Sequence, residues 1–372
     1  MECFGRDGES TELWKLFNAK ANILMLAPRR IGKTVLMHHL GTEAAAKGYK
    51  AVMLNVEGLQ DEKEFFRECC AAIQEELSAG KKVMTALSQR LSQLVLGSNS
   101  ADWRAVLLQA DWQEFANHLF AHLDQLDEDK KPWLLLVDEL PVFVQALQQK
   151  SGPEAVSRFL YWLRNMRQKH RNIRWLYAGS IGLDTVARRT NVEGALNDLT
   201  PYTLRPYTEV TARSFIESLA KKNGTQFTVS AMDTIIARLG WLSPRYLRVI
   251  VDDAIAIAET RPVDSKEASR AMDNLLDLDK RLYWSSWREH IDRNFTEPDR
   301  SHLHSVLEMT AKDSNGVTED ILQIGMPNLT KNQLRTVLDI LINDGFLNVS
   351  LERRYTFRMN LLREWWLRYV VL

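Results

Sequence analysis

Short apolar runs alternate with amphipathic stretches over the first half of the chain. Five of these runs have the length and composition of strands, and they cover residues 22–27, 50–56, 133–139, 172–180 and 202–204. Between the runs, apolar residues recur at every third or fourth position, which is the spacing of a helix with one buried face. The run at 133–139 is apolar without alternation, as expected for a strand buried on both faces of a parallel sheet. Strands that alternate with helices predict an α/β domain whose parallel sheet has helices on both faces.

The stretch between the second and third of these strands is long for one crossover. Residues 60–130 are mostly helical in pattern, whereas a crossover between parallel strands needs only about a dozen residues or more. We therefore expect an inserted helical hairpin around residues 80–110. Two further helices are expected, one over 33–47 and one that begins at Pro153, since proline is favoured in the first turn of a helix.

The pattern changes after residue 207. Residues 208–295 contain only helical patterns, which predicts a helical lid over the α/β core. The last segment has three helical stretches, two short strand-like runs and a final helix, which is the winged-helix arrangement. We predict a nucleotide-binding core at 1–207 with a helical insertion at about 60–130, a lid and connecting helix at 208–297, and a winged-helix domain at 298–372.

The composition is that of an ordinary soluble globular protein, with 45% hydrophobic and 26% charged residues. Lys plus Arg and Asp plus Glu number 48 each, so the whole-chain charge favours neither nucleic acid nor a membrane as a partner. The three cysteines, Cys3, Cys69 and Cys70, suit neither a disulfide framework nor a metal site. Without a signal-peptide pattern or an apolar run of about 18 residues, the sequence predicts a cytoplasmic protein that does not enter a membrane.

Candidate chemistry begins in the loop after the first predicted strand. This loop and its flanks lie between a strand and a helix, the context of a phosphate-binding loop. Its backbone N–H groups and the helix N-terminus make an anion site, Lys33 would reach the β- and γ-phosphates of ATP, and the Thr34 hydroxyl would complete the shell of a Mg²⁺ ion. A glycine usually opens such a loop, and Ala27 is tolerable there if its φ is negative. The expected nucleotide-binding residues are Ala27, Pro28, Arg29, Arg30, Ile31, Gly32, Lys33, Thr34 and Val35.

A second signal lies at the end of the run at 133–139. Asp138 and Glu139 stand at the carboxyl end of that predicted strand, where open α/β sheets bind ligands. Asp138 would hold Mg²⁺, directly or through water, and Glu139 would orient and polarise the attacking water. The plainer alternatives are a fortuitous helix start at the loop and a strand that ends in a polar turn. The two signals together favour a site for ATP or ADP with Mg²⁺.

With these motifs, the chain resembles the AAA+ ATPases, and most of all the archaeal-type ATPases, which are related to the origin-recognition initiators and to the STAND signalling ATPases. The resemblance covers nearly the whole chain, and the residues that carry it are 4–6, 28–34, 178–182, 204–207, 240–247, 357 and 361–366. It implies that Arg6 passes near the adenine and that Ser180 is a sensor for the γ-phosphate or the attacking water. It also implies that Pro244 and Arg245 form a phosphate sensor in the lid, although Arg245 can equally be a surface residue.

The resemblance further implies an AAA+ core that forms a homo-oligomer or joins a partner protein. In such assemblies, a neighbouring subunit can supply an arginine finger. Arg188, Arg189 and Arg205 all remain candidates for this role.

The last domain has equal numbers of basic and acidic residues over 301–372, so its charge alone does not decide whether it binds DNA. Position still favours contact with double-stranded DNA, because a recognition helix and a wing both carry basic or polar residues. The candidates on the helix are Lys331, Asn332, Gln333 and Arg335, and those on the wing are Arg353, Arg354 and Arg358.

Three functions are consistent with these features. The first is an ATP-driven switch that oligomerises and engages DNA. The second is a STAND-like signalling or defence ATPase whose winged helix binds a protein or holds the ATPase closed. The third is a nucleotide-binding scaffold with little turnover, and the role of Glu139 in hydrolysis separates it from the other two.

Overall fold

The computed structural model describes residues 3–76, 89, 111–125, 131–179, 183, 187 and 191–371. By their contacts, the residues form two compact units. The first consists of Met1–Ala27 and Lys33–Leu204, and the second of Pro28–Gly32 and Arg205–Leu372. The short segment Pro28–Gly32 therefore packs with residues that follow it by more than 170 positions.

A five-stranded parallel sheet with the order β2-β3-β4-β1-β5 forms the centre of the first unit. The strands are β1 (Asn22–Leu26), β2 (Lys50–Asn55), β3 (Trp133–Asp138), β4 (Ile173–Ala178) and β5 (Leu199–Thr203). Every residue of the inner strands β3 and β4 is buried, as the unbroken apolar run predicted for β3. The edge strand β5 begins earlier than the expected 202–204 and contains Pro201, which an edge strand tolerates because one side of its backbone is not paired.

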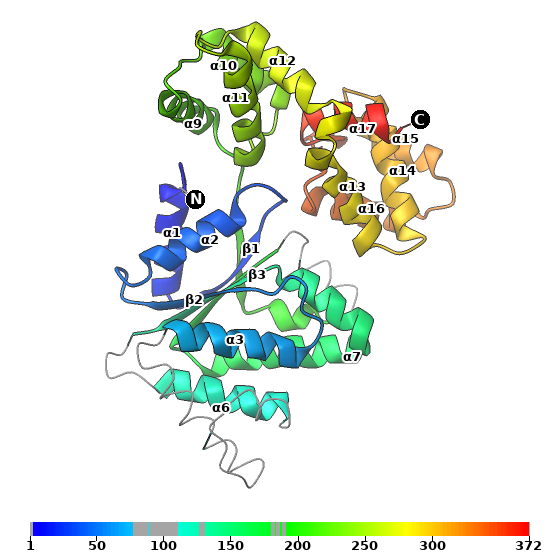
Figure 1. Ribbon diagram of the computed structural model, residues 1–372. Coiled ribbons are helices and arrows are strands. Elements are labelled where there is room, and N and C mark those ends of the chain that lie inside the picture. Colours follow the sequence, from blue (N-terminus) through cyan, green and yellow to red (C-terminus); the bar gives the residue numbers. More distant parts are fainter. Residues whose placement is uncertain are drawn as a thin grey trace. The chain divides into compact units, whose positions relative to one another are not determined.

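Helices cover both faces of this sheet (Figure 1). They are α1 (Asp7–Asn18), α2 (Lys33–Glu43), α3 (Glu62–Glu76), α6 (Trp112–Gln125) and α7 (Leu140–Lys169), with a short 3-10 helix η1 (Glu193–Leu196) before β5. In Figure 1, α1 and α2 lie on one face, and α3, α6 and α7 lie on the other. The predicted α/β fold class with a parallel sheet between two helical layers is confirmed.

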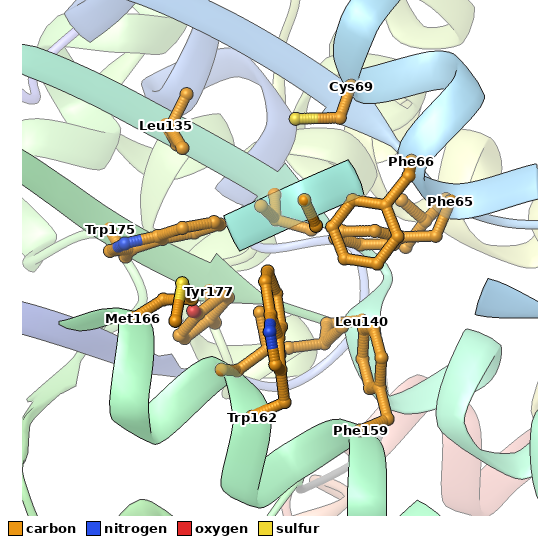
Figure 2. Packing of buried hydrophobic residues seen from close by; sticks show 14 of the residues in the cluster. Phe65, Phe66, Cys69, Leu135, Leu140, Phe159, Trp162, Met166, Trp175 and Tyr177 are labelled. Atoms are coloured by element: carbon orange, nitrogen blue, oxygen red, sulfur yellow. The ribbon is translucent and has the colours of Figure 1, made fainter. Parts of the chain in front are cut away.

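Aromatic side chains fill the core between the sheet and the α3, α6 and α7 layer (Figure 2). The ring of Phe66 on α3 stacks on Trp112 of α6 at 5.2 Å between centroids and meets the edge of Trp162 of α7 at 4.9 Å. Trp175 and Tyr177 of β4 continue the cluster toward the sheet, with their ring centroids 5.6 Å apart. These contacts join α3 and α6 to the core, while the hairpin expected at 80–110 lies outside the described residues.

Two helices differ in their limits from the prediction. The helix expected to begin at Pro153 begins at Leu140, because two helical segments are joined at a kink. Gly152 forms the kink with φ 82° and ψ 174°, and Pro153 then starts the second segment in the way the sequence suggested. The helix expected over 33–47 ends at Glu43, and turns lead from it to Gly48, whose φ is +81°.

Helices make up residues 205–297, as predicted, apart from one isolated β-bridge between Phe227 and Val263. They are α9 (Glu209–Lys222), α10 (Val229–Leu239), α11 (Pro244–Ala258), α12 (Ser265–Leu275), a 3-10 helix η2 (Leu278–Lys280) and α13 (Leu282–Asn294). Side-chain caps fix several of their starts: Thr208 accepts a hydrogen bond from Thr211 N, and Asp264 and Glu267 form a capping box. The buried rings of Tyr246 on α11 and Trp284 on α13 stack at 4.8 Å and join the two helices.

The end of the second unit has the order of elements predicted for a winged helix. It comprises α14 (Asp299–Lys312), β6 (Val317–Thr318), α15 (Glu319–Gly325), α16 (Lys331–Asn343), β7 (Leu347–Val349), β8 (Arg354–Phe357) and α17 (Asn360–Tyr369). The sheet has three antiparallel strands in the order β6-β8-β7, and the two-residue β6 was too short to be predicted. The domain limits at 207 and 297 stay predictions. None of the described helices combines the length and the apolar character that a membrane crossing requires.

Candidate nucleotide-binding site

The candidate site lies at the carboxyl edge of the parallel sheet. The phosphate loop follows the end of β1, and Asp138 is the last residue of β3, one strand away across β4. Parallel strands end at the same edge, so the loop and the carboxylate face the place where open α/β sheets bind ligands. The helix α2 begins at Lys33 and directs its N-terminus to this edge.

Thr34 and Asp138, the two predicted Mg²⁺ ligands, are in contact. Thr34 Oγ1 donates a hydrogen bond of 2.6 Å to Asp138 Oδ2, and the main-chain N–H of Glu139 donates to Asp138 Oδ1 at 3.0 Å. Asp138 is buried, so its carboxylate is held in one orientation. A hydroxyl and a carboxylate are hard oxygen ligands of the kind Mg²⁺ takes from a protein, with phosphate and water completing its shell.

Thr34 and Asp138 also suit Mg²⁺ better than they suit a metal ion that takes all of its ligands from the protein. Among the described residues there is no group of three or more His, Cys, Asp or Glu side chains that could hold a metal. Magnesium in phosphate-transferring sites is usually held by one or two carboxylates together with the phosphates. Asp138 and Thr34 are sufficient for that arrangement.

Lys33 closes the loop on itself. Its side chain is buried, and Nζ donates a hydrogen bond of 2.9 Å to the main-chain carbonyl of Ala27, the first residue of the loop. The ammonium group is thereby held across the loop at the N-terminal end of α2. Val35, half-buried in the first turn of α2, completes this part of the predicted set.

Glu139 has a strained backbone beside Asp138. It caps α7 with a φ of 60° and a ψ of 29°, the left-handed conformation that a residue with a side chain seldom adopts. A Cβ placed on Gly179, which follows β4, would lie 3.6 Å from Glu139 Oε2 and only 2.4 Å from the ring of Pro141. The carboxyl group of Glu139 therefore lies against the backbone at the end of β4, which has space only for glycine.

The middle of the loop, Pro28–Gly32, makes its contacts within the second unit. Arg30, at φ 65°, donates from Nη1 to Tyr283 O at 2.6 Å and to Tyr246 Oη at 3.2 Å, and its Nη2 donates to Ser286 Oγ. Ser243 Oγ returns a hydrogen bond of 2.7 Å to Arg30 O. Ser243, the residue before α11, therefore fixes the backbone of Arg30, while α11 and α13 fix its side chain.

Neighbouring loop residues strengthen this attachment. Arg29 Nη1 donates to Ser286 O at 3.1 Å, and Ile31 is buried. Pro28 packs against Gly345 so closely that a Cβ on this glycine would lie 2.4 Å from Pro28 Cβ. Nothing local in the sequence predicted these contacts, because the partners lie more than 200 positions away along the chain.

Pro244 and Arg245, the predicted lid sensor, begin α11. Pro244 takes the first helical position, and Arg245 is exposed with its guanidinium 6.0 Å from the centre of the Tyr283 ring. Burial lowers the pKa of Arg30, and the positive charges of Arg245 and Arg29 lower it further. Three guanidinium groups therefore gather in the second unit, and an anion bound among them would relieve their repulsion.

Four further predicted residues have no established place at this site. Arg6 is buried at the start of α1, where it forms an ion pair with Glu9, and its expected place near the adenine stays a prediction. Ser180 follows Gly179 directly but lies outside the described residues, as do Arg188 and Arg189.

The predicted DNA-contacting residues at the start of α16 are exposed, but two of them have structural partners. Gln333 forms a capping box with Thr330, and Arg335 Nε pairs with Glu319 Oε1 at 2.9 Å. In the part of the chain that the structure describes, the side chains of Lys331 and Asn332 have neither an ion pair nor a hydrogen bond, so they are available to a ligand.

The arginines of the wing also differ in whether their side chains are held by hydrogen bonds within the domain. Arg353 is exposed, whereas Arg354 Nη1 donates to Gly316 O at 3.0 Å. The guanidinium of Arg358 is half-buried and donates to Ile342 O at 3.1 Å and to Leu347 O at 3.2 Å, and burial lowers its pKa. Arg358 thus ties the wing to the end of α16.

Comparison with known proteins agrees with the geometry. Residues 7–131 match a family model described as an AAA-like domain. The Walker-type ATPase PABY2304 of Pyrococcus abyssi is similar in structure, with a TM-score of 0.69 and 15% identity over 97% of this chain and 95% of that one. The Aeropyrum pernix ORC2 protein, solved as ADPNP–ADP complexes, gives a TM-score of 0.57 and 14% identity over 97% and 91%. No curated protein sequence matches the chain.

These likenesses confirm the predicted resemblance to archaeal-type AAA+ ATPases related to origin-recognition proteins at the level of the fold. The roles of the individual site residues do not follow from them, because sequence identity to both structures is low.

Proposed function

We propose that the chain is an ATP-binding and ATP-hydrolysing switch of the AAA+ type. The observation that carries this proposal is the 2.6 Å hydrogen bond between Thr34 and Asp138, which brings together a phosphate loop and a carboxylate from two separate strands. The neighbouring Glu139 and the buried Lys33 complete the set of groups that phosphoryl transfer to water requires.

Each residue has a distinct task in this proposal. Lys33 and the main-chain N–H groups of the loop neutralise charge on the β- and γ-phosphates, and Thr34 and Asp138 hold Mg²⁺. When bound, Mg²⁺ supplies charge neutralisation at the phosphate oxygens. Glu139 orients and polarises the attacking water, and Ser180 contacts the γ-phosphate or that water. Arg6 near the adenine and Arg245 near the phosphates are the peripheral members of this site.

The loop itself suggests how the state of the nucleotide is transmitted. Lys33 and Thr34 belong to the first unit, whereas Pro28–Gly32 pack within the second. A phosphate group that reorganises the loop therefore acts on residues that α11 and α13 hold through Arg30. This gives a physical route from ATP or ADP to the lid and the winged helix.

The substitution Glu139→Gln tests the enzymatic part. It removes the charge that polarises water and leaves the loop intact, so we expect ATP to remain bound while steady-state turnover falls by about 100-fold or more. Glu154→Gln, an exposed change on α7, is the matched control. Equal turnover in both variants would exclude Glu139 from the mechanism and favour a scaffold or another base.

We further propose that the switch forms a homo-oligomer or joins a partner protein, and that its winged helix engages double-stranded DNA. The exposed positions of Lys331, Asn332 and Arg353 support the second statement. Family resemblance alone supports the first.

A STAND-like ATPase whose winged helix binds protein is the second candidate, and specific observations favour it. Arg335 is already paired with Glu319, and Asp339 lies exposed one turn further along α16. The same domain exposes apolar side chains at Ile324 and Leu351, which are 80% and 101% exposed. Such side chains suit a protein partner better than a phosphate backbone.

A further inference from the structure

A cavity lies at the edge of the first unit's sheet that is opposite to the phosphate loop. Its volume is about 460 Å³, within the range of small-molecule sites. Its walls include Asn22 at the start of β1, Arg174 near the start of β4 and Asp198 just before β5. The cavity is therefore at the amino ends of the strands, whereas the phosphate loop follows a carboxyl end.

Cationic side chains dominate its lining. Lys20, Arg167, Arg171 and Arg174 face a single acid, Asp198. Arg167 pairs with both oxygens of Asp198, at 2.8 Å from Nε and 2.7 Å from Nη2, and so neutralises the charge of this carboxylate. In the described part of the chain, the other three cations form no ion pair. The cavity thus has a local excess of positive charge.

Because Arg174 is buried, its share of this excess positive charge costs free energy. The residue is only 5% exposed, and its hydrogen bonds within the described residues go to main-chain carbonyls, at 3.3 Å to Phe17 O and 3.4 Å to Ile173 O, and also to Arg171 O. Burial lowers its pKa, because the charged form loses hydration that carbonyl groups replace only in part. A buried guanidinium without an adjacent carboxylate gains stability when an anion binds beside it.

Asp124 does not supply that anion. Its charge acts on Arg174 and partly offsets the effect of burial. Its carboxylate is engaged elsewhere, however, because it accepts a hydrogen bond of 2.9 Å from Asn172 N and lies 3.4 Å from His170 Nδ1.

We propose that this cavity binds an ion or small molecule that carries phosphate groups. Guanidinium and ammonium groups together match phosphate oxygens, and an excess of three cations suits a ligand with more than one negative charge. Neutral donors are also present. Asn22 Oδ1 accepts from Trp175 N at 3.0 Å, which leaves the Asn22 amide N–H groups for a ligand, and Gln168 lines the same cavity.

Titration calorimetry with inorganic pyrophosphate at low salt tests this proposal. All proteins carry Lys33→Ala, which weakens binding at the phosphate loop equally in each of them, so that a difference between the variants reports on the cavity and is independent of the proposed ATPase function. The variant Lys20→Ala/Arg171→Ala removes two exposed cations of the cavity, and we expect its affinity for pyrophosphate to fall by about tenfold or more. The matched control is Lys47→Ala/Arg67→Ala, which removes exposed cations elsewhere in the first unit.

Three results would overturn the proposal. One is the same affinity in the cavity variant and the control, and another is binding of citrate as tight as that of pyrophosphate, which would show no preference for phosphate. The third concerns Asp127, Glu128 and Asp129, which lie outside the described residues. If pyrophosphate binds only after these three are changed to their amides, the protein's own carboxylates fill the cavity.

Discussion

Glu139 shows how a single residue of the candidate site is constrained. Its left-handed backbone, at φ 60°, costs about 1–3 kcal/mol for a residue with a side chain. The strain places the Glu139 N–H on Asp138 Oδ1 and the Glu139 carboxyl group beside Gly179. The proposed role of Glu139 needs one fixed position, which gives a reason for strain of this size to persist.

The close fit at Gly179 leads to a prediction about stability and turnover. In Gly179→Ala, the new Cβ would meet the Pro141 ring at 2.4 Å, so Pro141, two residues after Glu139, must shift. We expect the free energy of unfolding to fall by about 1–3 kcal/mol and ATP turnover to fall with it. Thermal unfolding and turnover are measured beside Gly8→Ala, where an added Cβ meets no atom within 4 Å. A Gly179→Ala protein as stable and active as this control would disprove the close fit.

Some of the site could be predicted residue by residue, and some could not. Lys33 and Thr34 were predicted from the loop sequence between an apolar strand and a helix, and Asp138 and Glu139 because they stand at the end of an apolar strand. The conformation of Glu139 was not predictable, because it depends on how α7 begins against the end of β4. The cations of the cavity at the amino ends of the strands carried no motif, since their positions become neighbours only when the strands pair.

At the scale of elements, local pattern determined most strands and helices but not every boundary. The inner strands were predicted well because burial on both faces leaves an unbroken apolar run, as in β3. The start of α7 was missed because the proline at 153 is the clearer signal, although the chain is already helical from Leu140. The short strand β6 has only two residues, and its pairing with β8 is a tertiary effect.

The elements of the winged helix give a prediction about DNA. Lys331 at the start of α16 and Arg353 on the wing are the exposed cations that would meet phosphates, so Lys331→Ala/Arg353→Ala should weaken binding to duplex DNA. The slope of log affinity against log salt should decrease by about one for each phosphate that the variant no longer neutralises. Fluorescence anisotropy at several salt concentrations measures both quantities.

Arg300→Ala/Lys312→Ala on α14 is the control for that titration, because Arg300 is half-buried, Lys312 is exposed, and both lie outside the recognition helix and the wing. No measurable affinity of the unmodified protein for DNA at low salt would remove the DNA proposal. The protein-binding alternative would then be favoured.

For the whole molecule, the loop is the feature that both units share. Lys33 and Thr34 pack with the sheet, whereas Pro28–Gly32 pack with α11, α13 and the turn at Gly345. The fold class and the resemblance to AAA+ ATPases were predictable from motif order, but this division of one loop was not, because it depends on contacts between distant parts of the sequence. In the proposed function, this division makes the loop the point at which nucleotide binding acts on the second unit.

The most direct test of the proposed phosphate site compares the affinity for ATP of the Lys33→Ala variant with that of the unmodified protein. The Lys33 ammonium is buried and fixed on Ala27 O at 2.9 Å, where it would lie against the phosphates. In Lys33→Ala, calorimetric titration with ATP and Mg²⁺ should show affinity reduced by about 10- to 100-fold, the equivalent of one charge-assisted hydrogen bond. The control Lys47→Ala, on the exposed turn after α2, should bind as the unmodified protein does. Equal affinity of Lys33→Ala and the control would contradict the phosphate site and the function built on it.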